Sequence, residues 1–542
     1  MKARNQEGTA APRPASLHLA ILGAACAVAW FVAHAVPALF QLEFGDETEH
    51  IVAARMIVAG ERLYSTIFAN HGALPYVLSH VWLLLTGTRD LASHRLVALA
   101  LFALCAGTVY ASPALTQTRA RLHALTLFLV PLGVLYAGIP LHMMMYQSMA
   151  GALLTIELAL FAVPAVFGIA PPRWAAVAAG LAAAGAVFAA FSFAVAAALL
   201  AATIVALPPD AAGLRRRAIS GFLAGALAGV AAVGAWITLY ADWLGYFVYH
   251  YLFNMTIYMD VTQYSPFRPL RALGLLDFEA DELIYTFAAA VCGVAAVVIV
   301  ALSWPGTANR AALRWVVALA ALAVGVAYLN PLGGNGFQAS TWTAGTLGLG
   351  ALALAKLLVP EPGAARFPRL RSAGAHACIA VLAGALVFVS QFARSSPHGI
   401  PLPELAGRRD GAVRPSEERV YRLIRELVPA DERILAVPFA PEVYVYAERL
   451  PVSGNTFYQP IQARYATRPL WGYHIDLCKD VIERRPKVVY VSNPSSQWAW
   501  RFAQYAPCVQ RQIDDNYVGL PWAPEFFVRR DVAAARPQIM KE

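Results

Sequence analysis

A cluster of ionisable side chains near the start of the chain is the feature most capable of chemistry. The segment 44–50 carries three carboxylates and an imidazole, on Asp46, Glu47, Glu49 and His50. It directly follows an apolar stretch over residues 17–40, which is long enough to cross a bilayer. Ionisable groups held at a bilayer surface are candidates for function. Neighbouring carboxylates can divide the work, because one can take a proton from a nucleophile while another orients a hydroxyl or binds a metal.

The cluster must be positioned by a short helix, which the sequence predicts over residues 47–59 and ends at a glycine. On that helix Asp46, Glu49 and His50 share one face, while Glu47 points about 100° away. A purely structural role is also open. Asp46 followed by Glu49 matches a capping box, in which the Asp46 carboxylate accepts from the Glu49 amide. The two roles are compatible, since a capping carboxylate is rigid and can present its second oxygen.

The composition predicts a polytopic membrane protein. Of 542 residues, 59% are hydrophobic and only 14% are charged, and the mean hydropathy is +0.54. The net charge of +9 does not indicate nucleic-acid binding, because the basic residues gather in short connections between apolar runs. Placing those connections in the cytoplasm satisfies the positive-inside rule and gives about eleven spans. The predicted spans cover residues 17–40, 93–112, 121–139, 145–168, 173–190, 191–208, 217–240, 283–303, 312–329, 337–359 and 373–393.

We therefore expect an all-α polytopic bundle with a small α/β domain after it. A cytoplasmic tail (1–16) would precede the membrane domain (17–393), and an extracytoplasmic domain (394–542) would follow. Two long outer connections are expected, a first outer loop over 41–92 and a second over 241–282. Within the first loop we expect a helix at the membrane interface, over residues 74–85, anchored by Tyr76 and Trp82. In the last domain the pattern predicts helices over 416–428 and 475–484 and strands over 433–437 and 487–491.

Six cysteines divide by this topology. Those within predicted spans are small apolar fillers, namely Cys26, Cys105, Cys292 and Cys378. Cys478 and Cys508 share the outer C-terminal region, where a disulfide and two free thiols are equally open. No spacing indicates a zinc site.

Several cations and histidines outside the cluster could contact an anionic substrate. Arg95 opens a span on the outer side, against the positive-inside tendency, which suggests that an anion holds it there. Arg268 and Arg271 follow a run of aromatic residues in the second outer loop and would suit a lipid headgroup and its phosphate. His71 and His142 lie in outer connections, where a lone histidine is more often a cap or a hydrogen-bonded surface residue.

At these residues the chain resembles the polyprenyl-phosphate-sugar glycosyltransferases with the GT-C fold, which include protein O-mannosyltransferases and lipid A aminoarabinose transferases. The matching pattern begins with Asp46-Glu47 after the first span. It continues with the helix ending near Ala59–Tyr64, then Asn70–Tyr76, where the family tends to have His-Pro-Pro-Leu, and then Arg95. The resemblance is firm over about residues 17–210.

Two departures from the family pattern concern the substrate more than the fold. Gly72-Ala73 replaces the usual proline pair. The acidic residue that many relatives carry in the outer turn before the fourth span is missing, with His142 and Gln147 nearest.

The resemblance implies transfer of a sugar, with inversion, from a polyprenyl-phosphate donor to a glycan, lipid or protein acceptor on the outer face of a bacterial inner membrane. It also implies site roles. Asp46 and Glu47 would be catalytic, with Asp46 as general base or orienting carboxylate. A divalent metal could bind near these two residues. The substrate would contact Glu49, His50, Tyr64, His71 and His142, and the phosphate would contact Arg95, Arg268 and Arg271.

Two other classes of function stay open. A transporter or flippase for a lipid-linked glycan should have internal repeats or broken helices with buried charge at the membrane midplane. The predicted central spans are nearly free of charge, which favours surface chemistry. A non-catalytic assembly protein that binds glycan through its outer domain is the third class. The sequence identifies neither the sugar, the acceptor nor the oligomeric state.

Overall fold

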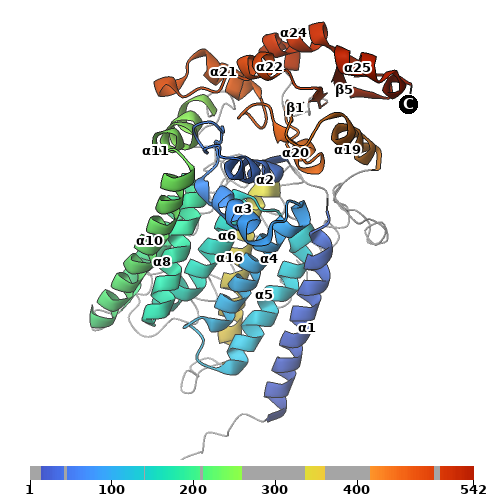
Figure 1. The fold of residues 1–542 in the computed structure, drawn as a ribbon. Coiled ribbons are helices and arrows are strands. Elements are labelled where there is room, and N and C mark those ends of the chain that lie inside the picture. The colour runs from blue at the N-terminus through green and yellow to red at the C-terminus, as the bar shows by residue number, and fades with distance from the viewer. Residues whose placement is uncertain are drawn as a thin grey trace, which may run out of the picture.

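The structure is a computed structural model of the chain, drawn in Figure 1. The residues that the structure describes are 14–41, 45–138, 141–207, 212–258, 336–359, 415–492 and 501–541. They form a bundle of long helices with a mixed α/β region lying across one end of it (Figure 1).

The bundle contains helices at every predicted span that falls within the described residues. They are α1 (Pro14–Ala38), α4 (Leu91–Ala111), α5 (Thr118–Gly138), α6 (Tyr146–Glu157) continued by η1 (Leu158–Ala162) and α7 (Val163–Val166), α8 (Arg173–Ala189), η2 (Phe191–Phe193), α9 (Ala194–Ala202), η3 (Thr203–Ala206), α10 (Ala212–Tyr240) and α16 (Gly336–Leu358). Among described helices, five are long and apolar enough to cross a membrane. The predicted spans 283–303, 312–329 and 373–393 lie outside the described residues.

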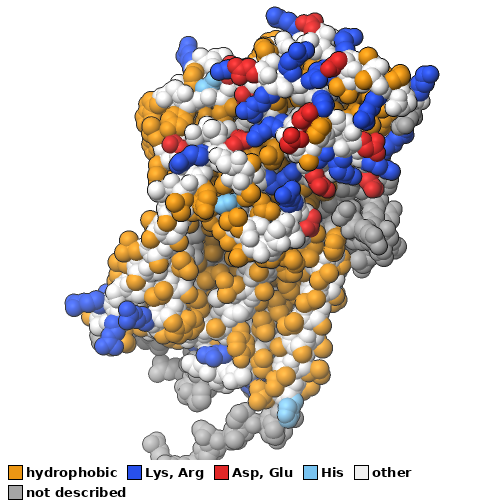
Figure 2. All heavy atoms as spheres, viewed as in Figure 1, with side chains coloured by type: hydrophobic (Ala, Val, Ile, Leu, Met, Phe, Trp, Pro, Cys, Tyr) orange, Lys and Arg blue, Asp and Glu red, His pale blue; other side chains and the backbone are white. Residues whose placement is uncertain are grey.

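The surface of the bundle is that of a multi-pass membrane protein. Figure 2 shows hydrophobic side chains over the helices, whereas charged side chains crowd the α/β region at the other end. The basic run Arg215–Arg217 lies in the first turns of α10, at the far end of the bundle from the α/β region (Figure 1). Charge at both ends and an apolar belt between them is the distribution that a bilayer requires.

Small residues let α8 and α10 pack closely. A Cβ at Gly180 of α8 would collide with the Phe222 carbonyl, and one at Gly225 of α10 would collide with the Val177 carbonyl. Glycines and alanines at such an interface let the two backbones approach, and the resulting van der Waals packing favours association of helices in a membrane.

The connection between α1 and α4 contains two further helices. α2 (Gly45–Val58) begins one residue before Asp46, so that Asp46 lies inside the first turn and the predicted capping box is wrong. The predicted end is confirmed, because Gly60 has a positive φ of 95°. α3 (Ala73–Thr86) is the predicted short apolar helix. At about 1.5 Å per residue it is too short to cross a ~30 Å hydrocarbon core.

The segment after α10 continues as short helices. They are α11 (Trp243–Gly245), η5 (Tyr246–Leu252) and η6 (Asn254–Tyr258). The rest of the predicted second outer loop, including Arg268 and Arg271, lies outside the described residues.

The C-terminal α/β region (residues 415–541) is built on a five-stranded sheet of order β2-β1-β3-β5-β4. β1 pairs with β2 and β3 in parallel, and β5 pairs with β3 and β4 antiparallel. The strands are β1 (Arg433–Val437), β2 (Leu450–Pro451), β3 (Val488–Val491), β4 (Tyr517–Leu520) and β5 (Ala523–Arg529). The helices are α19 (Pro415–Leu427), α20 (Glu442–Tyr446), α21 (Pro460–Thr467), η7 (Leu470–Gly472), α22 (Leu477–Arg484), α23 (Phe502–Tyr505), α24 (Pro507–Asn516), α25 (Arg530–Ala535) and η8 (Pro537–Met540). The two strands and two helices predicted here are confirmed.

A disulfide between Cys478 and Cys508 joins α22 to α24. The two cysteines are 30 residues apart in the sequence and their Cα atoms are 6.0 Å apart.

Replacing both cysteines by serine is expected to destabilise the C-terminal α/β region. Opening a cross-link over a loop of this length costs about 3–4 kcal/mol, mainly by freeing the unfolded chain. The measurement is the thermal unfolding midpoint of the purified protein in detergent. Cys26→Ser, at an exposed free cysteine, is the matched control and should leave that midpoint unchanged. Equal midpoints for all three proteins would contradict a stabilising disulfide.

Candidate active site

A buried ion pair fixes the position of α2. The Arg95 guanidinium of α4 lies against the Glu47 carboxylate, with Nη2 2.7 Å from Oε2 and Nε 3.0 Å from Oε1. Both side chains are fully buried. The Met144 amide also donates to Glu47 Oε1, at 3.0 Å. Arg95 Nη1 donates to the carbonyls of Leu39, at 3.1 Å, and Gln41, at 2.7 Å. The pair thus ties the end of α1, the start of α2, α4 and the turn before α6.

This arrangement bears on two predicted site residues. Arg95 was expected to be held by an anion, and the anion that the structure places beside it is the Glu47 carboxylate. A buried arginine and a buried carboxylate need each other, because either charge alone in a dry interior is costly. Glu47 and Arg95 therefore face each other, on a different side of α2 from Asp46.

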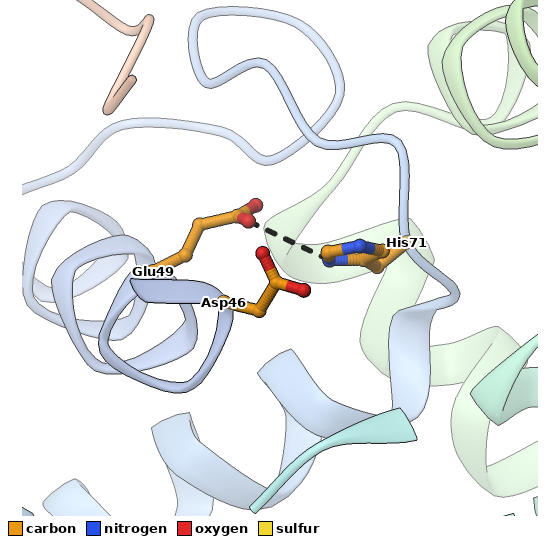
Figure 3. A group of neighbouring side chains, drawn as sticks. All are labelled: Asp46, Glu49 and His71. Atoms are coloured by element: carbon orange, nitrogen blue, oxygen red, sulfur yellow. Dashed lines mark ion pairs between the residues drawn. The ribbon is translucent and has the colours of Figure 1, made fainter. Parts of the chain in front are cut away.

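On that other side, Asp46, Glu49 and His71 converge, and we call them the acidic triad. Figure 3 shows both carboxylates of α2 reaching toward the imidazole of the segment before α3. One ligand atom from each residue lies within 4.8 Å of the others. Glu49 Oε2 is 3.5 Å from His71 Nδ1. Asp46 keeps partial exposure to solvent, whereas Glu49 is buried.

Aromatic and imidazole side chains surround the triad. The Tyr76 hydroxyl donates to Glu49 Oε1 at 2.5 Å, and the Tyr64 hydroxyl donates to the His71 carbonyl at 2.8 Å. The His50 ring centroid is 4.7 Å from that of Tyr76 and 5.7 Å from that of His71. Its Nδ1 donates to the Met144 carbonyl at 3.1 Å. The structure thus brings Glu49, His50, Tyr64 and His71 together with Asp46.

Desolvation dominates the electrostatics of this site. Burial raises the pKa of Asp46 to about 7. Burial also raises the pKa of Glu49 well above its ordinary value, against the hydrogen bond from Tyr76 and with help from the charge of Asp46. The same desolvation lowers the pKa of His50 to about 3 and that of His71 well below its ordinary value. Carboxylates with raised pKa values in a protein interior are typical of functional sites.

The architecture of this chain is similar to that of solved membrane enzymes. The chain is similar to ArnT from Cupriavidus metallidurans bound to undecaprenyl phosphate, with a TM-score of 0.53 and 14% identity over 94% of this chain and 98% of that chain. The chain has the GT-C fold. It is also similar to the oligosaccharyltransferase of Archaeoglobus fulgidus tethered with an acceptor peptide, at 12% identity over 96% of this chain and 74% of that chain. The TM-score of that match is 0.47. No protein-family model and no curated protein sequence matches the chain.

One further predicted site residue, His142, lies apart from the triad. His142 is buried beside Tyr136, and its Nδ1 donates to the Tyr136 carbonyl at 3.2 Å. Burial and then the charge of Arg95 hold the pKa of His142 well below its ordinary value. His142 therefore belongs to the side of α2 that carries the Glu47–Arg95 pair.

Two contributors to the site were not recognised in the sequence. Tyr76 was expected to anchor α3 at the membrane interface, but it is fully buried and bonded to Glu49, so that prediction is wrong. The Tyr76 hydroxyl could have indicated a contact with a polar group, since a buried tyrosine needs a hydrogen-bond partner. His250 of η5 supports the His71 segment: its Nδ1 donates to the Asn70 carbonyl at 3.0 Å, and its Nε2 accepts from the Phe191 amide at 3.2 Å. No local pattern links His250 to Asn70, which is far away in the sequence.

Breaking the buried ion pair is expected to destabilise the fold strongly. Arg95→Met leaves the Glu47 carboxylate buried without its partner, at a cost of about 3–5 kcal/mol. The double variant Glu47→Leu with Arg95→Met should recover much of that loss, because it removes both charges. The measurement is thermal unfolding in detergent.

The control for this experiment is Glu483→Gln, which removes an exposed pair with Lys479. Such surface pairs contribute at most about 1 kcal/mol. A small effect of Arg95→Met, equal to that of the control, would refute the anchoring role of the pair.

Proposed function

We propose that this protein is a membrane glycosyltransferase that moves a sugar from a polyprenyl-phosphate donor to a glycan, lipid or protein acceptor. The observation that carries the proposal is the acidic triad, with Asp46 and Glu49 on α2 and His71 just before α3, at the end of an apolar bundle with the GT-C fold. A polyprenyl donor requires that its tail lies among membrane helices while its sugar reaches polar groups. Asp46 is partly exposed and next to the bundle, which fits both demands.

In the proposed reaction Asp46 takes the proton of an acceptor hydroxyl, or orients the acceptor if it is already anionic. The acceptor oxygen attacks the anomeric carbon and the bond from that carbon to the phosphate oxygen breaks, so that polyprenyl phosphate leaves. A single displacement of this kind inverts the anomeric centre. A raised pKa suits a general base, since proton transfer is most efficient when the base titrates near the working pH.

The surrounding groups would position the sugar. The rings of His50, Tyr64 and Tyr76 lie around the carboxylates. Aromatic side chains with a few polar groups among them are typical of small-ligand sites. Glu47 and Arg95 would act through their ion pair, which positions Asp46 by fixing α2. Arg268 and Arg271 are retained as candidate phosphate ligands from the sequence.

The proposed location is a bacterial inner membrane, with the acidic triad on the outer face and the N-terminus in the cytoplasm. The basic start of α10 supports this orientation, because it lies at the opposite end of the bundle.

One observation favours a second candidate, the transporter. Glu157 at the end of α6 is fully buried, and neither carboxylate oxygen has a hydrogen-bond partner among the described residues. An acid inside a membrane bundle often marks an ion or proton path. The GT-C architecture and the triad at the bundle end favour the transferase. Glu157→Gln separates the two, because it should abolish a proton-coupled transporter and leave sugar transfer intact.

Asp46→Asn is expected to abolish sugar transfer while expression and thermal unfolding stay normal. Removing a general base or orienting carboxylate typically costs about 10²–10⁴-fold in rate. The assay is transfer from a radiolabelled polyprenyl-phosphate sugar in membranes, together with mass spectrometry of surface glycans from a strain lacking the gene.

Asp431→Asn, at an exposed carboxylate of the C-terminal α/β region, is the matched control and should retain full transfer. Unchanged transfer by Asp46→Asn would remove the proposed function.

A further inference from the structure

A patch of exposed hydrophobic side chains lies beside the end of α10 that is nearer the C-terminal α/β region, and we call it the aromatic patch. Most of its members belong to α11, η5 and η6, and one belongs to η7 of the C-terminal α/β region. They are Trp243, Leu244, Phe247, Tyr251, Met255 and Trp471, and all are exposed. Exposed hydrophobic patches mark sites of interaction with another protein or with a membrane.

Two parts of the chain that are far apart in the sequence build one surface here. Members of the patch recur every four residues from Trp243 to Met255, so they share one face of the helical segment. The Phe247 ring is stacked on Tyr251, with centroids 5.3 Å apart and planes 15° apart. On the same helix it is also stacked on Trp471, with centroids 5.9 Å apart and planes 22° apart. Trp471 thus extends the aromatic face of η5 onto the C-terminal α/β region.

Hydrogen bonds hold the Trp471 segment against the end of α10. The Tyr473 hydroxyl donates to Asp242 Oδ1 at 2.5 Å. The Tyr465 hydroxyl donates to the Tyr473 carbonyl at 2.7 Å and accepts from the Leu470 amide at 3.2 Å. The position of Trp471 is therefore set by its neighbours on both sides.

The backbone of Trp471 is strained. Its φ of 51° and ψ of 29° lie in the left-handed region, which bulky side chains rarely adopt. A residue held there costs free energy, and such residues gather where a protein binds something. Since 61% of the surface of Trp471 is exposed, packing within the chain offsets little of that cost. A partner outside the chain would explain why a tryptophan is presented in this way.

The aromatic patch lies at the depth of a membrane surface. From Arg217 to Tyr240, α10 rises about 35 Å at 1.5 Å per residue, and the hydrocarbon core of a bilayer is ~30 Å thick. With Arg217 at one surface of the bilayer, Tyr240 lies at the other, and α11 and η5 follow directly. Tryptophan and tyrosine are enriched at that depth in membrane proteins. Figure 2 shows hydrophobic side chains continuing from the helices to the edge of the α/β region over α11.

The chemistry of the patch favours lipid over a glycan. Stacked aromatic rings suit both, but Leu244 and Met255 offer no hydrogen bond to a sugar hydroxyl. Arg468, three residues before Trp471, is also exposed, and basic side chains beside tryptophan are typical of segments that lie in the plane of a membrane surface. The patch also continues an exposed apolar face of α10 that a bilayer must cover. The exposed members of that face are Leu223, Leu227, Val230 and Leu239.

We propose that the C-terminal α/β region binds the lipid surface of the membrane through the aromatic patch, with Trp471 at the boundary between headgroups and acyl chains. This contact is a second attachment of the region, besides its contacts with α2. It also concerns the helix behind the patch, because the other face of η5 carries Tyr246 stacked on His250, at 5.2 Å. Lipid on one face of η5 thus helps to fix the helix whose His250 supports the His71 segment. The proposal does not depend on sugar transfer.

The test is photo-cross-linking of the full-length protein in vesicles of phosphatidylethanolamine and phosphatidylglycerol. Benzoylphenylalanine, which reacts with nearby C–H bonds under ultraviolet light, replaces Trp471 in one variant and Phe247 in another. Ile482→benzoylphenylalanine is the matched control, because Ile482 is 47% exposed but lies on α22, at the far side of the α/β region from the bundle (Figure 1). Thermal unfolding in detergent checks that each variant is folded.

We expect both patch variants to form about tenfold more lipid adduct than the control, since only they lie at the membrane surface. The adducts are identified by mass spectrometry. Lipid adduct at position 247 with none at position 471 overturns the proposal, because η5 alone would then meet the lipid. A cross-link from position 471 to protein, within one chain or between two copies, overturns it in favour of a protein partner. So does an adduct with glycan in place of lipid when the Trp471 variant is irradiated in intact cells.

Discussion

The rotation of α2 about its own axis is the constraint on which the site depends, and the Glu47–Arg95 ion pair sets it. A fully buried charge must find its partner, so α2 cannot turn without breaking the pair. Because Glu47 points about 100° from Asp46 on the helix, fixing Glu47 against α4 leaves Asp46 and Glu49 facing the His71 segment. The adjacent carboxylates of Asp46 and Glu47 thus face different surroundings, because Glu47 anchors the helix against α4 and Asp46 lies in the candidate site.

The segment that carries His71 is fixed by contacts with residues that are far away in the sequence. Gly72 lies so close to the carbonyls of Phe188 and Ala189, at the end of α8, that no side chain would fit. His250 and Asn254 both donate to the Asn70 carbonyl, at 3.0 Å and 2.7 Å. Gly72, where the transferases that the sequence resembles tend to have proline, therefore has a packing reason in this chain.

Local patterns in the sequence predicted local structure well. Helical spacing predicted α2 and the shared face of Asp46 and Glu49, and apolar runs predicted α3 and the described spans. Contacts between residues far apart in the sequence could not be predicted, because no local pattern links Glu47 to Arg95 or Glu49 to Tyr76. Arg95 illustrates the limit. Its unusual position correctly indicated a nearby anion, but only the packed structure shows that the protein supplies that anion itself.

The C-terminal α/β region touches α2 at both of its ends. A Cβ at Gly45 would collide with the Phe439 ring, and Arg55 Nη1 donates to the Tyr444 carbonyl at 2.7 Å. In the connection after α2, the Phe68 amide also donates to the Gly454 carbonyl at 3.0 Å. This region is consequently not a detachable module. A truncated chain would lose the contacts that Phe439 and Tyr444 make with α2, and a replacement region from another protein would have to reproduce the packing of an aromatic ring against Gly45. Changes to the C-terminal α/β region that are meant to keep α2 in place should therefore be point substitutions and not exchanges of whole segments.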